Sequence, residues 1–73
     1  MIFESNINQK IQLATNTYNA GKLDEAEKLY REILEILPQD NSIHNNLGNT
    51  LQGLGKLEEA NKSYRKAIKL KPD

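Results

Sequence analysis

One stretch of the sequence is written twice, 34 residues apart. Residues 21–26 read GKLDEA and residues 55–60 read GKLEEA. The same offset relates Tyr30 to Tyr64 further downstream. A fixed period of this length is typical of solenoids, in which each unit stacks on its neighbour because it cannot bury its apolar face alone. The repeat therefore restricts the chain to a stack of short, similar units.

The composition excludes several classes of protein. The 73 residues form one small domain at most, and ten basic residues balance ten acidic ones. Because the charges balance, the protein has no net electrostatic attraction for nucleic acid or an anionic membrane. The absence of cysteine excludes disulfides, thiol catalysis and the usual zinc sites. No apolar run approaches the roughly 18 residues of a spanning helix, and no signal peptide precedes the repeats. We therefore expect a cytoplasmic protein with no cofactor, no nucleic-acid partner and no membrane contact.

Capping and breaking residues divide the chain into four helices. Ser5 and Asn6 are N-cap types, and Gly21 can take the positive φ that follows a helix. Pro38 ends another helix, because the residue before a proline is pushed out of the α region. Between these signals the apolar residues follow a helical period. We predict helices over residues 6–20, 23–37, 41–54 and 57–70.

The apolar residues define the faces that these helices bury. The first helix has two adjacent stripes, one through Leu13 and Thr17 and the other through Ile7, Ile11 and Ala14. The second and third helices each have a single face. Their apolar positions are Leu23, Ala26, Tyr30, Ile33, Leu34 and Leu37 in the second, and Ile43, Leu47, Leu51 and Leu54 in the third.

Small and large residues occupy matching positions in the two copies. In the second copy these are His44, Leu47, Gly48, Leu51, Ala60, Tyr64 and Pro72. In the first copy they are Lys10, Leu13, Ala14, Thr17, Ala26, Tyr30 and Pro38. This spacing resembles the tetratricopeptide repeat, a helix–turn–helix unit with the pattern Trp-x2-Leu-Gly-x2-Tyr, then Ala-x3-Phe, then Pro. The resemblance covers nearly the whole chain.

The resemblance implies an all-α fold of two tandem units. The units would span residues 7–40 and 41–73, after an N-terminal extension at residues 1–6. Ala14 and Gly48 would let the two helices of a unit approach closely, while Tyr30 and Tyr64 would fill the space between units. Lys10 departs from the family's tryptophan, as does its counterpart in the second unit. The resemblance also implies a non-catalytic module that binds a protein or peptide partner.

No group of residues indicates catalysis. His44 is the only histidine and occupies a position where an aromatic residue usually packs, so we expect a packing or hydrogen-bonding role. The acid pairs at residues 24–25 and 58–59 recur at helix starts, which favours helix caps and dipole partners over general acid–base chemistry. The serines have no Gly-x-Ser-x-Gly context. We expect that the chain is not an enzyme, except in the case that it is a segment separated from a larger enzyme.

The asparagines provide the clearest functional signal. Asn46 directly precedes Leu47 and Gly48, which resembles the asparagine ladder in the repeats of O-linked N-acetylglucosamine transferases; there such residues hold the backbone of extended peptides. An amide suits this role because it offers a donor and an acceptor together. The counterpart of Asn46 in the first copy is Gln12. We predict a peptide-binding groove lined by Gln12, Thr15, Tyr18, Asn19, Asn45, Asn46, Asn49 and Gln52, while solvated polar faces remain the alternative.

The competing hypothesis is a structural unit that assembles with itself. The last predicted helix retains apolar residues that no later helix in the chain covers. Residues 7–40 carry four basic and six acidic residues, whereas residues 41–73 carry six basic and three acidic ones. This polarity would orient a head-to-tail stack, while solvated charged faces without such a role are the alternative. A two-fold contact between two last helices is the other arrangement. We expect a homo-oligomer that associates through Phe3, Tyr64, Ala67, Ile68 and Leu70.

Overall fold

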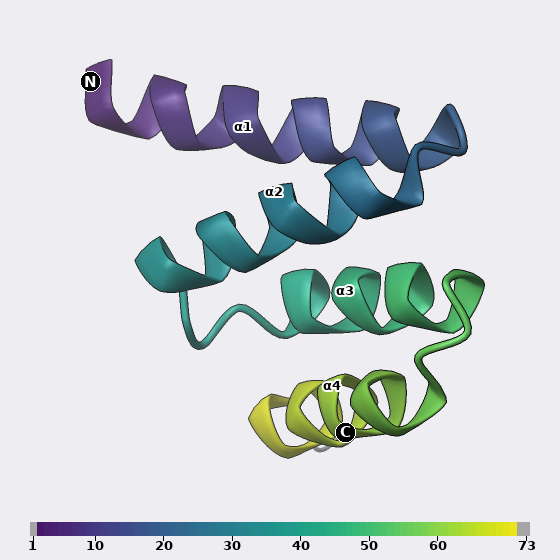
Figure 1. Cartoon of the computed structure of the whole chain (residues 1–73). Coiled ribbons are helices and arrows are strands. Elements are labelled where there is room, and N and C mark those ends of the chain that lie inside the picture. The colour runs from purple at the N-terminus through teal and green to yellow at the C-terminus, as the bar shows by residue number, and fades with distance from the viewer. Residues whose placement is uncertain (1, 72–73) are drawn as a thin grey trace.

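The fold is a stack of four helices. The computed structural model describes residues 2–71 and the side chains of residues 6–71. Its helices are α1 (Ile2–Asn19), α2 (Leu23–Ile36), α3 (Asn41–Gly53) and α4 (Leu57–Leu70), and successive helices run in opposite directions (Figure 1). The described residues contain no strand. The predicted all-α fold of two tandem helix–turn–helix units is therefore confirmed.

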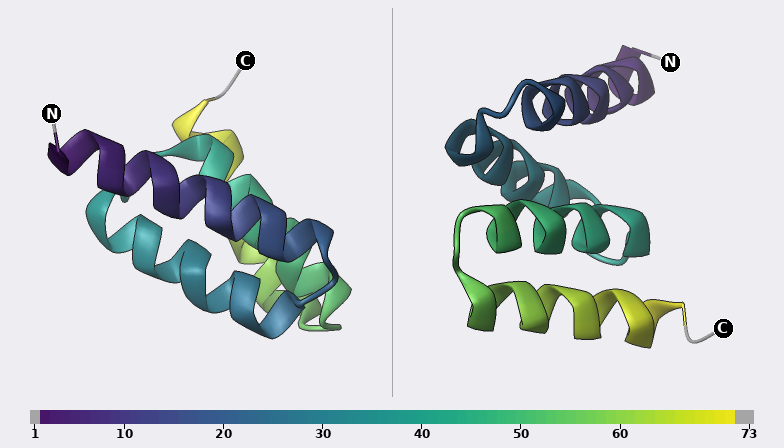
Figure 2. Two further views of the ribbon diagram at one scale, coloured as in Figure 1. Left: turned by 90° about the horizontal axis from the view of Figure 1, so that it is seen from above. Right: turned by 90° about the vertical axis from the view of Figure 1, so that its right-hand side faces the viewer.

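Each helix packs chiefly on its neighbours in the chain. α1 contacts α2, α2 contacts α3 and α3 contacts α4, and two further views show the same order (Figure 2). α2 and α3 are covered on two sides, whereas α1 and α4 each have one close neighbour among the described helices. The chain therefore has two end faces, as expected of a short solenoid.

α1 begins earlier than predicted. It starts at Ile2 and not at Asn6, so Ser5 and Asn6 lie inside the helix and do not cap it. The sequence has no proline or glycine before Gly21, and so no residue with a strong helix-breaking tendency stops the additional turn. The other helix bounds agree with the prediction to within one residue.

The turns use glycines and one carboxylate cap. Gly21 and Gly55 have φ angles of 82° and 80°, in the left-handed region that glycine enters without steric cost. Asp40 caps α3, since its Oδ1 accepts a hydrogen bond of 3.1 Å from the backbone N–H of Ile43. The structure thus selects one cap from the several polar residues of this turn.

The acid pairs at the starts of α2 and α4 do not cap these helices. The N-cap residues are Lys22 and Lys56, and neither makes a side-chain capping bond. All four acids lie in the first helical turn, where carboxylates favour the positive end of the dipole. The capping part of the prediction is wrong because the acids lie inside the helix and not at its cap position.

The core follows the middle of the stack and takes only one of the two stripes of α1. Ala14 is fully buried and Ile11 packs against the core, whereas Leu13 is 53 % exposed. Leu47, the counterpart of Leu13, is 3 % exposed because α3 lies between α2 and α4. The core consists of Ala14, Ala26, Tyr30, Ile33, Ile43, Leu47, Leu51 and Ala60.

α3 and α4 approach each other closely at Gly48. A Cβ at Gly48 would lie 2.7 Å from Cε1 of Tyr64, so the tyrosine ring fills the space that a side chain would need. Ala14 occupies the matching position in α1 and is fully buried. Small residues therefore permit the close approach, as predicted. The prediction that Tyr64 fills the space between units is wrong. Its ring packs against Gly48 within its own helix pair, because the absence of a side chain at Gly48 leaves room for the ring.

Candidate peptide-binding groove

A polar strip runs along α3 opposite its buried face. Ile43, Leu47 and Leu51 are buried, as are Gly48 and Thr50. Residues spaced three and four apart on the remaining side keep their polar groups towards solvent. The strip consists of Ser42, Asn45, Asn49 and Gln52, which are exposed or half-buried.

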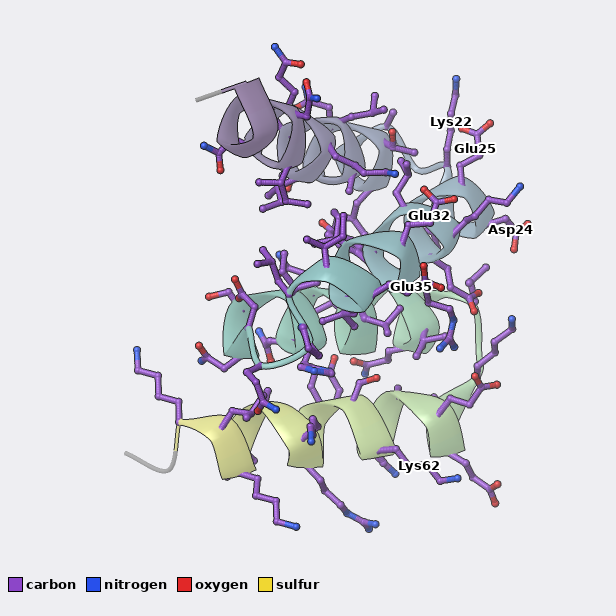
Figure 3. The ribbon with its side chains drawn as sticks, turned by 90° about the vertical axis from the view of Figure 1, so that its left-hand side faces the viewer. Lys22, Asp24, Glu25, Glu32, Glu35 and Lys62 are labelled. Carbon is purple, nitrogen blue, oxygen red and sulfur yellow. The ribbon has the colours of Figure 1, made fainter. Side chains whose placement is uncertain are left out.

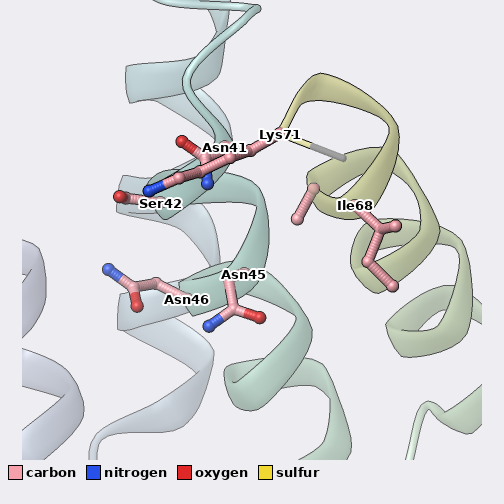
Figure 4. Close-up of a pocket in the computed structure, with 7 residues that line it drawn as sticks. Asn41, Ser42, Asn45, Asn46, Ile68 and Lys71 are labelled. Carbon is pink, nitrogen blue, oxygen red and sulfur yellow. The ribbon is translucent and has the colours of Figure 1, made fainter. Parts of the chain in front are cut away.

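A pocket of about 280 Å³ lies where α3 begins and α4 ends. The side chain of Lys71 extends across it towards Asn41 and Ser42 (Figure 4). Asn45 and Asn46 lie on the α3 side, and the remaining lining residues are Ala67 and Ile68. Within the described structure, the amides of Asn41, Asn45 and Asn46 make no hydrogen bond to another protein group. This pocket therefore collects amides whose donors and acceptors face water.

Two of the predicted groove residues are held by a tyrosine. The hydroxyl of Tyr64 lies 2.6 Å from Oδ1 of Asn49 and 2.8 Å from Oε1 of Gln52. A phenol has one proton, so it donates to one of these oxygens at a time. These bonds tie α4 to the polar strip of α3, and they leave the amide nitrogens of both residues available as donors.

α1 contributes less to the groove than α3. The hydroxyl of Thr15 lies 3.5 Å from that of Tyr30, which repeats the Asn49–Tyr64 contact at the same 34-residue offset but at greater length. Tyr18 is half-buried and packs against the core, whereas Gln12 and Asn19 are exposed. The structure thus brings the α3 residues of the predicted groove together, while those of α1 form a separate set.

His44 has the hydrogen-bonding role that we expected. Its Nε2 lies 2.9 Å from the backbone oxygen of Pro38, so the imidazole joins α3 to the turn that precedes it. Among the described residues, no cluster of three potential metal ligands occurs. Nor is any described helix long and apolar enough to cross a membrane.

Ion pairs connect the two helix pairs on the side of α2. Arg31 lies 2.9 Å from Glu27 in the preceding turn and 2.8 Å from Glu59 in α4. Lys56, before α4, lies 3.0 Å from Glu27. Glu27 is therefore held by two cations, and only 14 % of its side chain is exposed. This network fixes α4 relative to α2 across α3.

The network shifts the pKa values of two of its members. Burial raises the pKa of Glu27, but hydrogen bonds from Arg31 and Lys56 and their positive charges outweigh burial, so the pKa lies below its ordinary 4.5. The hydrogen bond with Glu27 and its negative charge raise the pKa of Lys56 above its ordinary 10.5. At the exposed pair between α1 and α2, a hydrogen bond from Lys10 lowers the pKa of Glu32.

We expect the stability of the fold to depend on the ionised form of Glu27. Because its folded pKa is lowered, its contribution is fully present above about pH 4.5 and is lost as the pH falls through the folded pKa. Glu27→Gln should therefore flatten the fall in melting temperature between neutral pH and pH ~3. Glu35→Gln, an exposed carboxylate outside the network (Figure 3), is the control. Equal acid sensitivity of Glu27→Gln and the wild type would contradict this role.

The residues predicted for self-association occupy different environments. Ile68 is 64 % exposed, Leu70 is half-buried and Ala67 is buried. Tyr64 is half-buried and faces α3. The side chain of Phe3 lies outside the described residues.

Sequence reasoning missed the ion pairs between the helix pairs. Lys56 and Glu59 have counterparts in Lys22 and Glu25, at equal places in the repeated stretch. The prediction that the acid pairs belong to helix starts does not include these contacts. In the second unit, Lys56 and Glu59 lie three residues apart and place two opposite charges against α2 of the preceding helix pair.

The comparison with known proteins agrees with this architecture. The sequence model of the tetratricopeptide repeat matches residues 7–73, whereas no curated protein matches the chain. Repeats of this kind generally mediate protein–protein interactions and are typically non-catalytic. The match spans nearly the full length and agrees with the four stacked helices. The chain therefore belongs to the tetratricopeptide repeat family.

Proposed function

We propose that the chain is a protein-interaction module that binds an extended peptide along the polar strip of α3 and in the pocket at the start of that helix. The observation that carries this proposal is the pocket at the start of α3. It gathers the side-chain amides of Asn41, Asn45 and Asn46, which have no hydrogen-bond partner among the side chains and backbone of residues 6–71. The proposal includes repeat units at residues 7–40 and 41–73.

Amide side chains suit a peptide backbone better than they suit a particular side chain. Each amide presents an acceptor oxygen and a two-proton donor, which match the N–H and C=O of one peptide unit. Asn46 lies at the pocket, and Asn45 and Asn49 continue the row along α3. A peptide lying on this row would be bound through its main chain, as the resemblance of Asn46 to the asparagine ladder suggests. Lys71, at the end of the pocket, favours an acidic residue in the peptide.

A peptide array compared between the wild type and Asn46→Ala tests the proposal. Two lost hydrogen bonds of about 1 kcal/mol each predict that affinity falls roughly tenfold or more. Asn16→Ala removes an exposed asparagine of α1 that is not among the predicted groove residues, and it is the matched control. Binding that survives Asn46→Ala for every detected peptide would refute the ladder.

A further inference from the structure

The outer side of α4 carries a row of residues that no described helix covers. Leu57 is 59 % exposed and Ile68 is 64 % exposed. Asn61 and Arg65 lie between them and are also exposed. With spacings of four, four and three residues, these side chains share one face of the helix. We call them the α4 row.

The α4 row repeats a row on α2 that forms a contact within the chain. Its counterparts, 34 residues earlier, are Leu23, Glu27, Arg31 and Leu34. Cδ1 of Leu23 lies 2.8 Å from the place of a Cβ on Gly53 in α3, and Leu34 packs against the core. Glu27 pairs with Lys56, and Arg31 pairs with Glu59. The α2 row is thus the surface on which the second helix pair is stacked.

The opposite end of the chain carries the complementary groups. Lys22 and Glu25 are the counterparts of Lys56 and Glu59, and Leu13 is the counterpart of buried Leu47. Neither Glu25 nor Arg65 forms an ion pair with another described side chain. Figure 3 shows Lys22 and Glu25 pointing towards the α1 end of the stack, away from α3. A second copy can therefore offer at this end what α3 and α4 offer to α2.

We propose that two copies of the chain bind head to tail, with the α4 row of one copy on the α1 end of the next, in the register of the contact between α2 and the second helix pair. Arg65 then pairs with Glu25 of the second copy, as Arg31 pairs with Glu59. Asn61 faces Lys22 of that copy, and Leu13 of that copy is covered. Because the two surfaces differ, the contact is heterologous, and a pair of copies keeps one free α4 row to which a further copy can bind.

Charge favours this arrangement over a two-fold contact between α4 helices. Residues 7–40 have an excess of acidic residues and residues 41–73 an excess of basic ones. None of these acids lies in α1, and the acid that head-to-tail stacking brings to Arg65 is Glu25 at the start of α2. Facing α4 helices would instead bring together two basic surfaces. The α4 row itself places Arg65 near its middle, where a two-fold axis would oppose like charges. A second copy stacked head to tail is therefore the occupant that the charges select.

Stacking covers Ile68 at the edge of the pocket but leaves the amides of α3 open to a peptide, and it does not depend on a bound peptide. Gln12, the counterpart of Asn46, stays exposed although α3 is stacked on α2. One position fits less well than in the chain itself, because Asn19 replaces Gly53 opposite the leucine of the row. There the side chain of Leu57 must rotate to avoid the asparagine Cβ, and its flexible end permits this.

Charge reversal tests the register by sedimentation equilibrium of the whole chain at low salt. Glu25→Arg and Arg65→Glu should each weaken association about tenfold, because each sets like charges opposite one another. An equimolar mixture of the two variants should restore wild-type association, since each contact then joins opposite charges. The double variant should do the same. Asp24→Arg, with the same charge change one residue away, should weaken association much less than Glu25→Arg does.

Four results would overturn the proposal. A wild type that stays monomeric at tens of micromolar would show that a second copy is not the occupant. Variants that do not recover on mixing would favour a two-fold contact between α4 helices. Association that is unaffected by either reversal, or equally affected by Asp24→Arg, would exclude the Arg65–Glu25 pair.

Discussion

Tyr30→Ala should abolish the cooperative unfolding transition of this chain. Tyr30 is 2 % exposed and belongs to the core on α2, which other helices cover on two sides. Removing a buried aromatic ring costs about 3–5 kcal/mol, and a core of this size supplies a similar surplus. Thermal melting followed by far-ultraviolet circular dichroism should show a broad transition without a native baseline.

The equivalent substitution in the second helix pair is the internal control. Tyr64 occupies the same place in the repeat but is half-buried, and so Tyr64→Ala should cost only about 2 kcal/mol. It should leave a cooperative transition at a lower temperature. A larger loss from Tyr64→Ala than from Tyr30→Ala would contradict the burial that separates the two helix pairs.

Leu47→Ala should also destabilise the chain strongly, by about 2–5 kcal/mol. Leu47 is almost completely buried in α3, the helix between α2 and α4. Truncation would leave a cavity where two helix pairs meet, and the well-packed neighbours would relax into it only in part. The midpoint of urea denaturation measures the loss, provided that the slope of the transition is unchanged.

Leu13→Ala at the same repeat position should cost less than about 1 kcal/mol. More than half of the Leu13 side chain is already exposed in the single chain. The measurement belongs at low protein concentration, because the proposed stacking would cover this residue. Similar losses for Leu13→Ala and Leu47→Ala in the monomer would show that α1 is buried like α3.

The sequence was sufficient to predict the helices because local signals agree with the repeat. Gly21 and Gly55, which follow the ends of α1 and α3, adopt the left-handed backbone conformation, and Asp40 caps α3. The predicted start of α1 at residue 6 was wrong, because Ser5 and Asn6 are tolerated inside a helix as well as at its cap. Capping residues show where a helix can begin, but they do not stop it from extending.

The contacts of individual side chains could be predicted only in part. The sequence gives Leu13 and Leu47 the same place in the repeat, and only the position of α1 at one end of the stack makes Leu13 exposed. The predicted packing of Tyr64 between units was wrong for a related reason. The tyrosine ring contacts Gly48 because α3 and α4 lie close together, and the repeat pattern does not show that spacing. Equal residues at equal repeat positions have different neighbours at the two ends.

The candidate groove shows the same limit. The polar face of α3 follows from helical spacing, and Asn45 and Asn46 line one pocket in the structure. The hydrogen bonds from Tyr64 to Asn49 and Gln52 join residues 15 and 12 positions apart in two helices. No local pattern predicts such bonds, because they depend on how the two helices are set against each other.

The most direct test of the proposed function locates a bound peptide on the chain. An isotope-labelled sample is titrated with an array-selected peptide while the side-chain amide resonances of asparagine and glutamine are followed. The account predicts that Asn41, Asn45 and Asn46 shift first and saturate together, while Asn61 on the outer side of α4 does not move. A shift of the Asn61 amide, with the pocket amides unchanged, would contradict a groove on α3.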